Sequence, residues 1–150
     1  MDYSYKQLMG ADVGVLKKLL KVFGEAFNDV KTYQDAVPSD AYLGSFLTKP
    51  HVIVLTAMQD TEVVGGLVAY EMEKFEQDRR EIYIYDLAVS EYHRRKGIAT
   101  KLINELSRIA KDRRAYVLMV QADKGDDPAI RLYESLGIKE EVYHFDIPVD

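Results

Sequence analysis

The amino-acid sequence predicts a single mixed α/β domain, and three observations support that prediction. The 150 residues suit one domain of ordinary size, with 47% hydrophobic and 30% charged residues. No repeat, low-complexity tract or linker divides them. Helical and strand-like patterns follow one another as two helices, a hairpin, and then strand, helix, strand, helix and strand.

The N-terminal third predicts two helices. Apolar residues recur every three or four positions up to about residue 28, and Asp12 precedes them as the expected N-cap. Residues 31–37 are expected to form a polar loop. Residues 39–47, which lie between two prolines, are expected to form a second, shorter helix.

Three apolar segments in the middle of the chain predict strands. Residues 51–57 and 63–70 are expected to pair as a hairpin, because a polar turn separates them. Gly65 and Gly66 weaken the second strand and predict a bulge or a close backbone neighbour. Residues 81–89 give the clearest strand pattern, since they are rich in β-branched and aromatic side chains.

The C-terminal part is expected to alternate between helices and strands. Residues 97–113 predict a helix with one buried stripe, and residues 115–121 predict a strand. A helix over residues 128–136 is expected to begin at a proline and to end at Gly137 as its C-cap. Residues 138–147 are expected to supply the last strand or strands.

Composition excludes several functional classes. The chain has no cysteine, so a disulfide scaffold, a thiolate metal site and a cysteine nucleophile are excluded. The three histidines lack metal-ligand spacing, and no metal site is expected. A net charge of -5 argues against general nucleic-acid binding. Because no signal peptide and no membrane-spanning apolar run is found, we expect a cytoplasmic protein without membrane contact.

One polar link carries the strongest chemical signal. The segment Arg94-Arg95-Lys96-Gly97-Ile98-Ala99 lies where a strand gives way to a helix. Unpaired amides and the helix dipole favour an anion there, and glycine lets the backbone approach it closely. The pattern suits a pyrophosphate, although it is neither a Walker loop nor the dinucleotide G-x-G-x-x-G motif. A solvated charge run before an ordinary helix is the alternative.

Charge is unevenly distributed along the chain. Residues 90–114 contain eight basic and three acidic side chains, whereas residues 123–150 contain eight acidic and three basic ones. Such a division could bring a phosphorylated cofactor and a polycationic substrate to one cleft. Two amphipathic helices with unlike surfaces would give the same counts.

Two motifs resemble those of a known family. Asp86-Leu-Ala-Val followed by Arg94-x-x-Gly97-x-Ala99 resembles the acetyl-CoA signature of the GCN5-related N-acetyltransferases (GNAT). Ala129-Ile-Arg-Leu-Tyr-Glu-Ser-Leu-Gly137 resembles their second signature. The resemblance implies one GNAT N-acetyltransferase domain over residues 1–150. Its expected fold is α/β (α+β mixed), with a central mixed, mostly antiparallel sheet that splays at the cofactor site and is flanked by helices.

Further segments resemble the aminoglycoside 3-N-acetyltransferases of type I, which acetylate gentamicin- and fortimicin-like antibiotics. These segments are residues 74–77, 81–90, 93–95, 120–123, 125–129, 140–142 and 144–147. The likeness covers most of the chain and is weakest over residues 1–30. Asp126 departs from the wider superfamily, which often has asparagine at this position.

The resemblance implies backbone contacts with acetyl-CoA. Leu87, Ala88 and Val89 are expected to pair with the pantetheine arm. The Leu87 amide is expected to stabilise an oxyanion at the thioester, an effect of about 3 kcal/mol in other acyl-transfer sites. The pyrophosphate loop and the start of the following helix are expected to bind the cofactor through Arg94, Arg95, Lys96, Gly97, Ile98, Ala99 and Thr100. Arg131 could meet a cofactor phosphate or lie on the surface.

Two side chains are candidates for proton transfer. Tyr133 matches the family's tyrosine that protonates the leaving thiolate, and a core aromatic is the alternative interpretation. Asp86 is the favoured base, because a carboxylate in an apolar strand is costly to bury unless it is partnered or functional. A structural aspartate and a water-relayed proton path remain open. Without cysteine, the acetyl group is expected to pass directly from cofactor to amine.

Carboxylates and tyrosines are candidates for binding a cationic substrate. The candidates are Glu81, Tyr83, Asp86, Asp123, Asp126 and Asp146. Asp123 is expected at the end of a strand beside the cleft, and Asp146 in an aromatic-rich final strand. Asp126 could instead be a solvated acid at a helix N-terminus. Tyr83 and Tyr85 share one face of the central strand and could line the cleft or pack in the core.

The resemblance implies a cytoplasmic enzyme that uses acetyl-CoA to acetylate an amino group of an aminoglycoside, the 3-amino group, and so gives antibiotic resistance. A homodimer joined through terminal strands is expected on the same ground. One alternative is acetylation of a polyamine or of a protein lysine. Another is a non-catalytic acyl-CoA-binding sensor, which would need neither Tyr133 nor Asp86.

Overall fold

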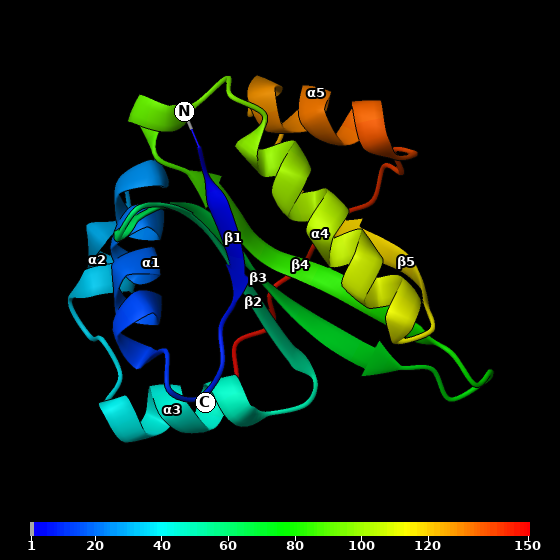
Figure 1. The fold of residues 1–150 in the computed structure, drawn as a ribbon. Coiled ribbons are helices and arrows are strands. Elements are labelled where there is room, and N and C mark those ends of the chain that lie inside the picture. Colours follow the sequence, from blue (N-terminus) through cyan, green and yellow to red (C-terminus); the bar gives the residue numbers. More distant parts are fainter. Residues whose placement is uncertain (1) are drawn as a thin grey trace.

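The computed structural model describes residues 2–150 and contains a five-stranded mixed sheet with helices on both faces (Figure 1). The strands are β1 (Ser4–Gln7), β2 (Val52–Gln59), β3 (Glu62–Glu73), β4 (Arg80–Val89) and β5 (Ala115–Val120). The helices are α1 (Val13–Ala26), α2 (Val30–Gln34), α3 (Asp40–Thr48), α4 (Ile98–Asp112) and α5 (Asp127–Leu136), with a 3-10 turn over Glu91–His93. Within residues 2–150, no helix is both long and apolar enough to cross a bilayer.

The sheet is mostly antiparallel. Its strands lie in the order β1-β2-β3-β4-β5, and only the β4–β5 pair is parallel. That pair ends where Ile84 lies opposite Val120, so the rest of β4 has β3 on one side and no strand on the other. The expected mixed, splayed sheet is therefore confirmed.

Two apolar clusters hold the helices to the sheet. On one face, the buried residues of α4 pack against Ile82 and Ile84 of β4 and their neighbours on β2 and β3. On the other face, α1 and α3 pack against Val52, Val54 and Ala88. Helix α5 contributes Leu132 and Tyr133 to the edge of the α4 cluster. The two faces of β4 are thus enclosed by different helices.

The glycine pair in β3 marks a close approach, as expected. A Cβ on Gly66 would lie 2.6 Å from Leu19 Cδ1 of α1, and a Cβ on Gly65 would lie 2.9 Å from the Ala88 carbonyl oxygen. The register with β2 also shifts beside Gly65. These contacts let α1 lie directly on β3, next to the part of β4 that follows Tyr85.

Three predictions for the N-terminal third are wrong or incomplete. The strand β1 was not expected, because its four residues show no apolar alternation. The expected polar loop contains helix α2, whose N-cap Asp29 accepts a hydrogen bond from the Thr32 amide. Asp12 stands at the N-cap of α1, but its side chain accepts from the Met9 amide and pairs with Lys6. The expected second helix is confirmed as α3, and Ser39 is its N-cap.

The expected final strand is absent. Residues 138–150 have no regular secondary structure and run from the end of α5 past the sheet, ending in the part of Figure 1 where α3 is drawn. The alternating apolar side chains of this C-terminal arm are exposed, and Phe145 is 79% exposed. Gly137 is the C-cap of α5, as expected, but its φ of -150° is extended and not left-handed.

Candidate active site

The site is built around a bulge in β4. Asp86 pairs with Val68 and Ile84 pairs with Ala69, so Tyr85 lies opposite no residue of β3. An extra residue of this kind breaks the usual alternation of side chains. Tyr85 and Asp86 consequently share the face toward α1 and α2, while Ile84 and Leu87 pack on the α4 side.

Asp86 is a half-buried carboxylate held by one hydrogen bond. The Tyr33 hydroxyl of α2 donates to Asp86 Oδ2 over 2.9 Å. Within the described chain, Asp86 has no ion pair with Lys, Arg or His. Burial raises the pKa of Asp86, and the hydrogen bond from Tyr33 opposes that rise. The carboxylate is therefore a weak acid without a fixed counter-ion.

Three tyrosines form an aromatic row beside Asp86. Tyr85 is 63% exposed, and its ring lies 6.0 Å from that of Tyr70 and 6.3 Å from that of Tyr83. The Tyr83 hydroxyl donates to Gln121 Oε1 over 3.1 Å. Burial raises the pKa of Tyr70 and of Tyr83, with smaller contributions from Tyr85 and Asp86. Aromatic faces next to an unpaired carboxylate make a surface that attracts cations.

The open edge of β4 leads to the start of α4. Gly97 is the N-cap of α4 with a φ of 78°, and no side chain caps the helix. A Cβ on Gly97 would meet nothing within 4 Å, so the backbone is open at this residue. Arg94 Nε bonds the Val89 carbonyl over 3.2 Å, whereas Arg95 and Lys96 are exposed. A left-handed residue, free amides and two loose cations fit a phosphate group.

Tyr133 lies on the other side of β4 from Asp86. It is half-buried on α5 and packs against the cluster beneath α4. Burial raises its pKa, with a smaller contribution from the charge of Asp126. A neutral phenol is therefore maintained at this position. The unpaired edge over residues 87–89 lies on the strand that separates Tyr133 from Asp86.

The other acidic candidates are dispersed. Glu81 accepts a hydrogen bond from Tyr116 and pairs with Lys74. Asp126 caps α5 by accepting from the Ala129 amide. Asp123 is exposed after β5. Asp146 lies on the C-terminal arm, where it bonds His144, and not in a strand.

The cofactor candidates beyond the loop are few. Arg131 is exposed on α5, while Ala99 and Thr100 lie half-buried in the first turn of α4. No group of three His, Asp or Glu side chains within residues 2–150 is arranged to hold a metal ion.

Sequence reasoning missed two residues of the site. Tyr33 lies in the segment expected to be a polar loop, and Tyr70 lies at the end of the expected hairpin strand. Nothing local links Tyr33 to Asp86, which is 53 positions away in the chain. The only available signal was the buried carboxylate itself, since such a group requires a partner.

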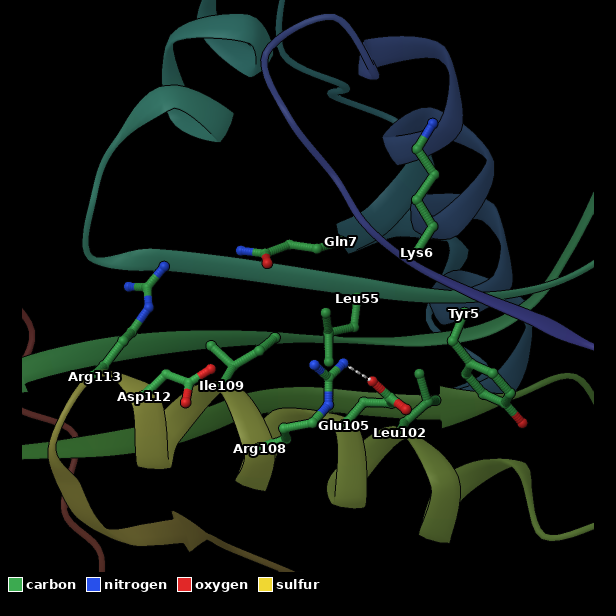
Figure 2. Close-up of a pocket in the computed structure, with 10 residues that line it drawn as sticks. All are labelled: Tyr5, Lys6, Gln7, Leu55, Leu102, Glu105, Arg108, Ile109, Asp112 and Arg113. Carbon is green, nitrogen blue, oxygen red and sulfur yellow. Dashed lines mark hydrogen bonds and ion pairs between the residues drawn. The ribbon is translucent and has the colours of Figure 1, made fainter.

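A separate cavity of about 350 Å³ lies between β1 and α4 (Figure 2). Its lining includes Tyr5 and Gln7 of β1 and the ion-paired Glu105 and Arg108 of α4. None of the candidate site residues lines it. The cavity is therefore distinct from the site at β4.

Comparison with known proteins identifies the fold. The profile of the Acetyltransferase (GNAT) family matches residues 16–138. A solved aminoglycoside acetyltransferase from an uncultured soil metagenomic sample is 52% identical, with a TM-score of 0.98 over 100% of both chains. No curated protein matches the chain.

Two further structures are similar. An aminoglycoside acetyltransferase from an uncultured soil metagenomic sample, in complex with sisomicin, is 28% identical, with a TM-score of 0.91 over 99% of this chain and 97% of that one. A ribosomal-protein-alanine N-acetyltransferase from Brucella melitensis biovar Abortus 2308 is 23% identical, with a TM-score of 0.77 over 99% and 100%, and shares the fold. This chain therefore belongs to the GNAT acetyltransferase family.

Proposed function

We propose that this protein uses acetyl-CoA to acetylate an amino group of an aminoglycoside, the 3-amino group. The observation that carries the proposal is the half-buried carboxylate of Asp86, which has no counter-ion and lies beside an aromatic row. An ammonium group would supply the missing charge. Support comes from the 52% identical aminoglycoside acetyltransferase and from the 28% identical relative in complex with sisomicin.

The residues present fit acetyl-CoA, which GNAT acetyltransferases use in general. The unpaired edge over Leu87, Ala88 and Val89 offers backbone groups to a pantetheine arm. The uncapped start of α4 and the open backbone at Gly97 fit a pyrophosphate, which would also meet the residues from Arg94 to Thr100. Arg131 is a further candidate for a cofactor phosphate.

Acetyl-CoA supplies an acetyl group activated as a thioester, and three groups of the chain serve the transfer. Asp86 would accept the proton that the acceptor ammonium must lose before its nitrogen bonds to the acetyl carbon. The Leu87 amide would donate to the thioester oxygen and stabilise the negative charge that develops there. Tyr133 would give a proton to the sulfur of CoA as its bond to the acetyl carbon breaks. The chain has no cysteine, so no thiol of the enzyme can carry the acetyl group.

The acidic residues around the site would hold the remaining amines of the substrate. Asp123 and Asp126 lie between β5 and α5, and Tyr83 lies beside Asp86 on β4. Asp146, on the C-terminal arm, is a further candidate to hold one of these amines. Glu81 already accepts a hydrogen bond from Tyr116 and pairs with Lys74, so it is the weakest of the acidic candidates for substrate binding.

The protein is also proposed to act as a homodimer. The C-terminal arm exposes Ile138, Val142, Tyr143, Phe145, Ile147 and Val149, each at least 73% exposed. The outer edge of β5 has no strand neighbour, and Tyr116 and Val117 on it are exposed as well. Unpaired edges and alternating apolar strands are satisfied by pairing with another chain. A second copy carries both features and can exchange arms reciprocally.

Release of free CoA tests the activity directly. Because the protein has no cysteine, a thiol-reactive dye added to the reaction detects only CoA. Gentamicin, fortimicin, spermidine and a lysine peptide are compared at equal concentration, and the acetylated product is located by NMR. Rapid turnover of gentamicin or fortimicin with acetylation at the 3-amino group is the expected result.

The other outcomes separate the alternatives. Turnover of spermidine or the peptide alone would refute the aminoglycoside substrate. Tight CoA binding without turnover would favour a sensor. In a susceptible bacterium, expression of the wild-type protein in the cytoplasm is expected to raise the inhibitory concentration of the accepted drug. Expression of Asp86→Asn in its place is expected to give no such protection.

A further inference from the structure

We infer that Tyr33 is a positioning residue for Asp86 and thereby sets the pH range in which the acceptor amine can be activated. The inference rests on the proposed function of Asp86. Tyr33 belongs to α2, a five-residue helix that lies beside α1, on the face of the sheet that Asp86 shares (Figure 1).

The hydrogen bond divides the work of the carboxylate. Tyr33 donates to Oδ2 of Asp86, and this is the one hydrogen bond of the Asp86 side chain among the described residues. Oδ1 is left for an incoming amine. The donor on Oδ2 restricts the orientation of the carboxylate and stabilises its ionised form. Without it, burial alone would act on the group, and burial favours the protonated acid.

The Tyr33 hydroxyl is the one neighbouring group that lowers the pKa of Asp86. The titratable groups facing Asp86 are Tyr33 from α2, Tyr70 from β3, and Tyr83 and Tyr85 from β4. From α1 the packing residues are apolar, with Phe23 against Tyr33. Close to these tyrosines, Asp29 acts on Tyr33 and the His51 ring stacks on Tyr70 at 6.4 Å. Among the described residues, no Lys, Arg or His acts on Asp86 itself, so no cation compensates for removal of the Tyr33 hydroxyl.

Packing holds Tyr33 in place independently of Asp86. Its ring lies 5.9 Å from that of Phe23 and 5.6 Å from that of Phe27. Gly24 of α1 allows this approach, since a Cβ there would lie 3.3 Å from Tyr33 Cβ. An added methyl group at position 24 would therefore push α2 away while leaving every hydroxyl intact. The chain thus offers two separate ways to loosen one hydrogen bond.

The pH dependence of turnover tests the inference. In Tyr33→Phe the pKa of Asp86 should rise, so the acid limb of kcat/KM for the acceptor should move up by about one pH unit. At pH values well below the acid limb this amounts to a loss of about tenfold, while the Kd for acetyl-CoA stays unchanged. Gly24→Ala should move the limb in the same direction, and the double variant should go little further than Tyr33→Phe. Tyr42→Phe, which removes an exposed hydroxyl from α3, should leave the profile unchanged.

A measurement without substrate keeps this inference separate from the proposed function. Carbon-13 NMR of the aspartate carboxyls, assigned with Asp86→Asn, gives the pKa of Asp86 in the free protein. A higher pKa in Tyr33→Phe than in wild type supports the link even if no aminoglycoside is acetylated. An equal pKa in both proteins, or an acid limb that does not move, would overturn it.

Discussion

Asp86 is a residue whose ionised form the fold holds at a cost. Its pKa is raised by burial, so the penalty is absent below the ordinary pKa of an aspartate and fully present above the raised one. Asp86→Asn should therefore raise Tm at pH 8, because it removes a charge that folding must desolvate. The same variant should lower kcat about 100-fold. Differential scanning calorimetry and steady-state kinetics check the two effects.

Asp35→Asn is the matched control, since Asp35 is exposed at the end of α2. It should change neither Tm nor kcat. A fall in Tm for Asp86→Asn would show that the carboxylate is structural. Near-normal kcat would remove it as the base and favour a water relay.

Tyr133 should act through its hydroxyl alone. Tyr133→Phe keeps the ring that packs beneath α4 and removes the proton donor. We expect kcat to fall about 100-fold with little change in the Kd for acetyl-CoA or in Tm. Stopped-flow kinetics measures kcat, calorimetric titration measures the Kd, and scanning calorimetry measures Tm. A loss of stability without loss of turnover would identify Tyr133 as a core aromatic.

At the scale of residues, the sequence indicated which carboxylate is unusual but not which residue it bonds. Asp86 stood out because a carboxylate in an apolar strand is rare, and the structure shows it half-buried. Tyr33 could not be found in this way, because only the folded chain brings α2 to β4. The bulge at Tyr85 also leaves no local trace, since its register depends on the pairing with β3.

Helix α4 begins at a residue that must be glycine-like. Gly97 has a φ of 78°, which costs an L-residue about 1 kcal/mol. Gly97→Ala should weaken acetyl-CoA binding about tenfold, because the first turn of α4 would shift away from the phosphates. Isothermal titration measures the change. Gly125→Ala imposes a similar backbone cost at φ 97° and should leave the Kd unaltered. Equal losses for the two variants would refute a phosphate site at α4.

The elements that were predicted correctly have their own buried stripes, whereas the others depend on neighbours. The amphipathic patterns of α1 and α4 are visible in the sequence because each helix packs one apolar stripe against a face of the sheet. The strand β1 exists because β2 offers an edge to it. Residues 138–147 carry the reverse lesson, since their alternation is strand-like but the described chain offers them no partner.

In the whole molecule, the apolar side chains of the C-terminal arm are exposed. If the C-terminal arm pairs with a second copy, analytical ultracentrifugation should give a dimer for the full chain and a monomer after deletion of residues 139–150. Phe145→Asp should shift the equilibrium toward monomer, because it places a charge among the apolar contacts. Phe75→Asp is the control, since Phe75 is fully exposed on the β3–β4 hairpin. A monomeric full chain would refute the proposal.

The bulge in β4 makes the position of the acid a matter of counting. Ile82, Ile84, Leu87 and Val89 all turn toward α4, although an even spacing cannot connect the first pair to the second. One supernumerary residue, Tyr85, restores the phase. Deletion of that single residue would leave two arrangements of the strand. In one, Leu87 and Val89 lose their apolar contacts with α4; in the other, Asp86 no longer faces its substrate. The chain length of this strand, as much as any side chain on it, therefore encodes where Asp86 faces.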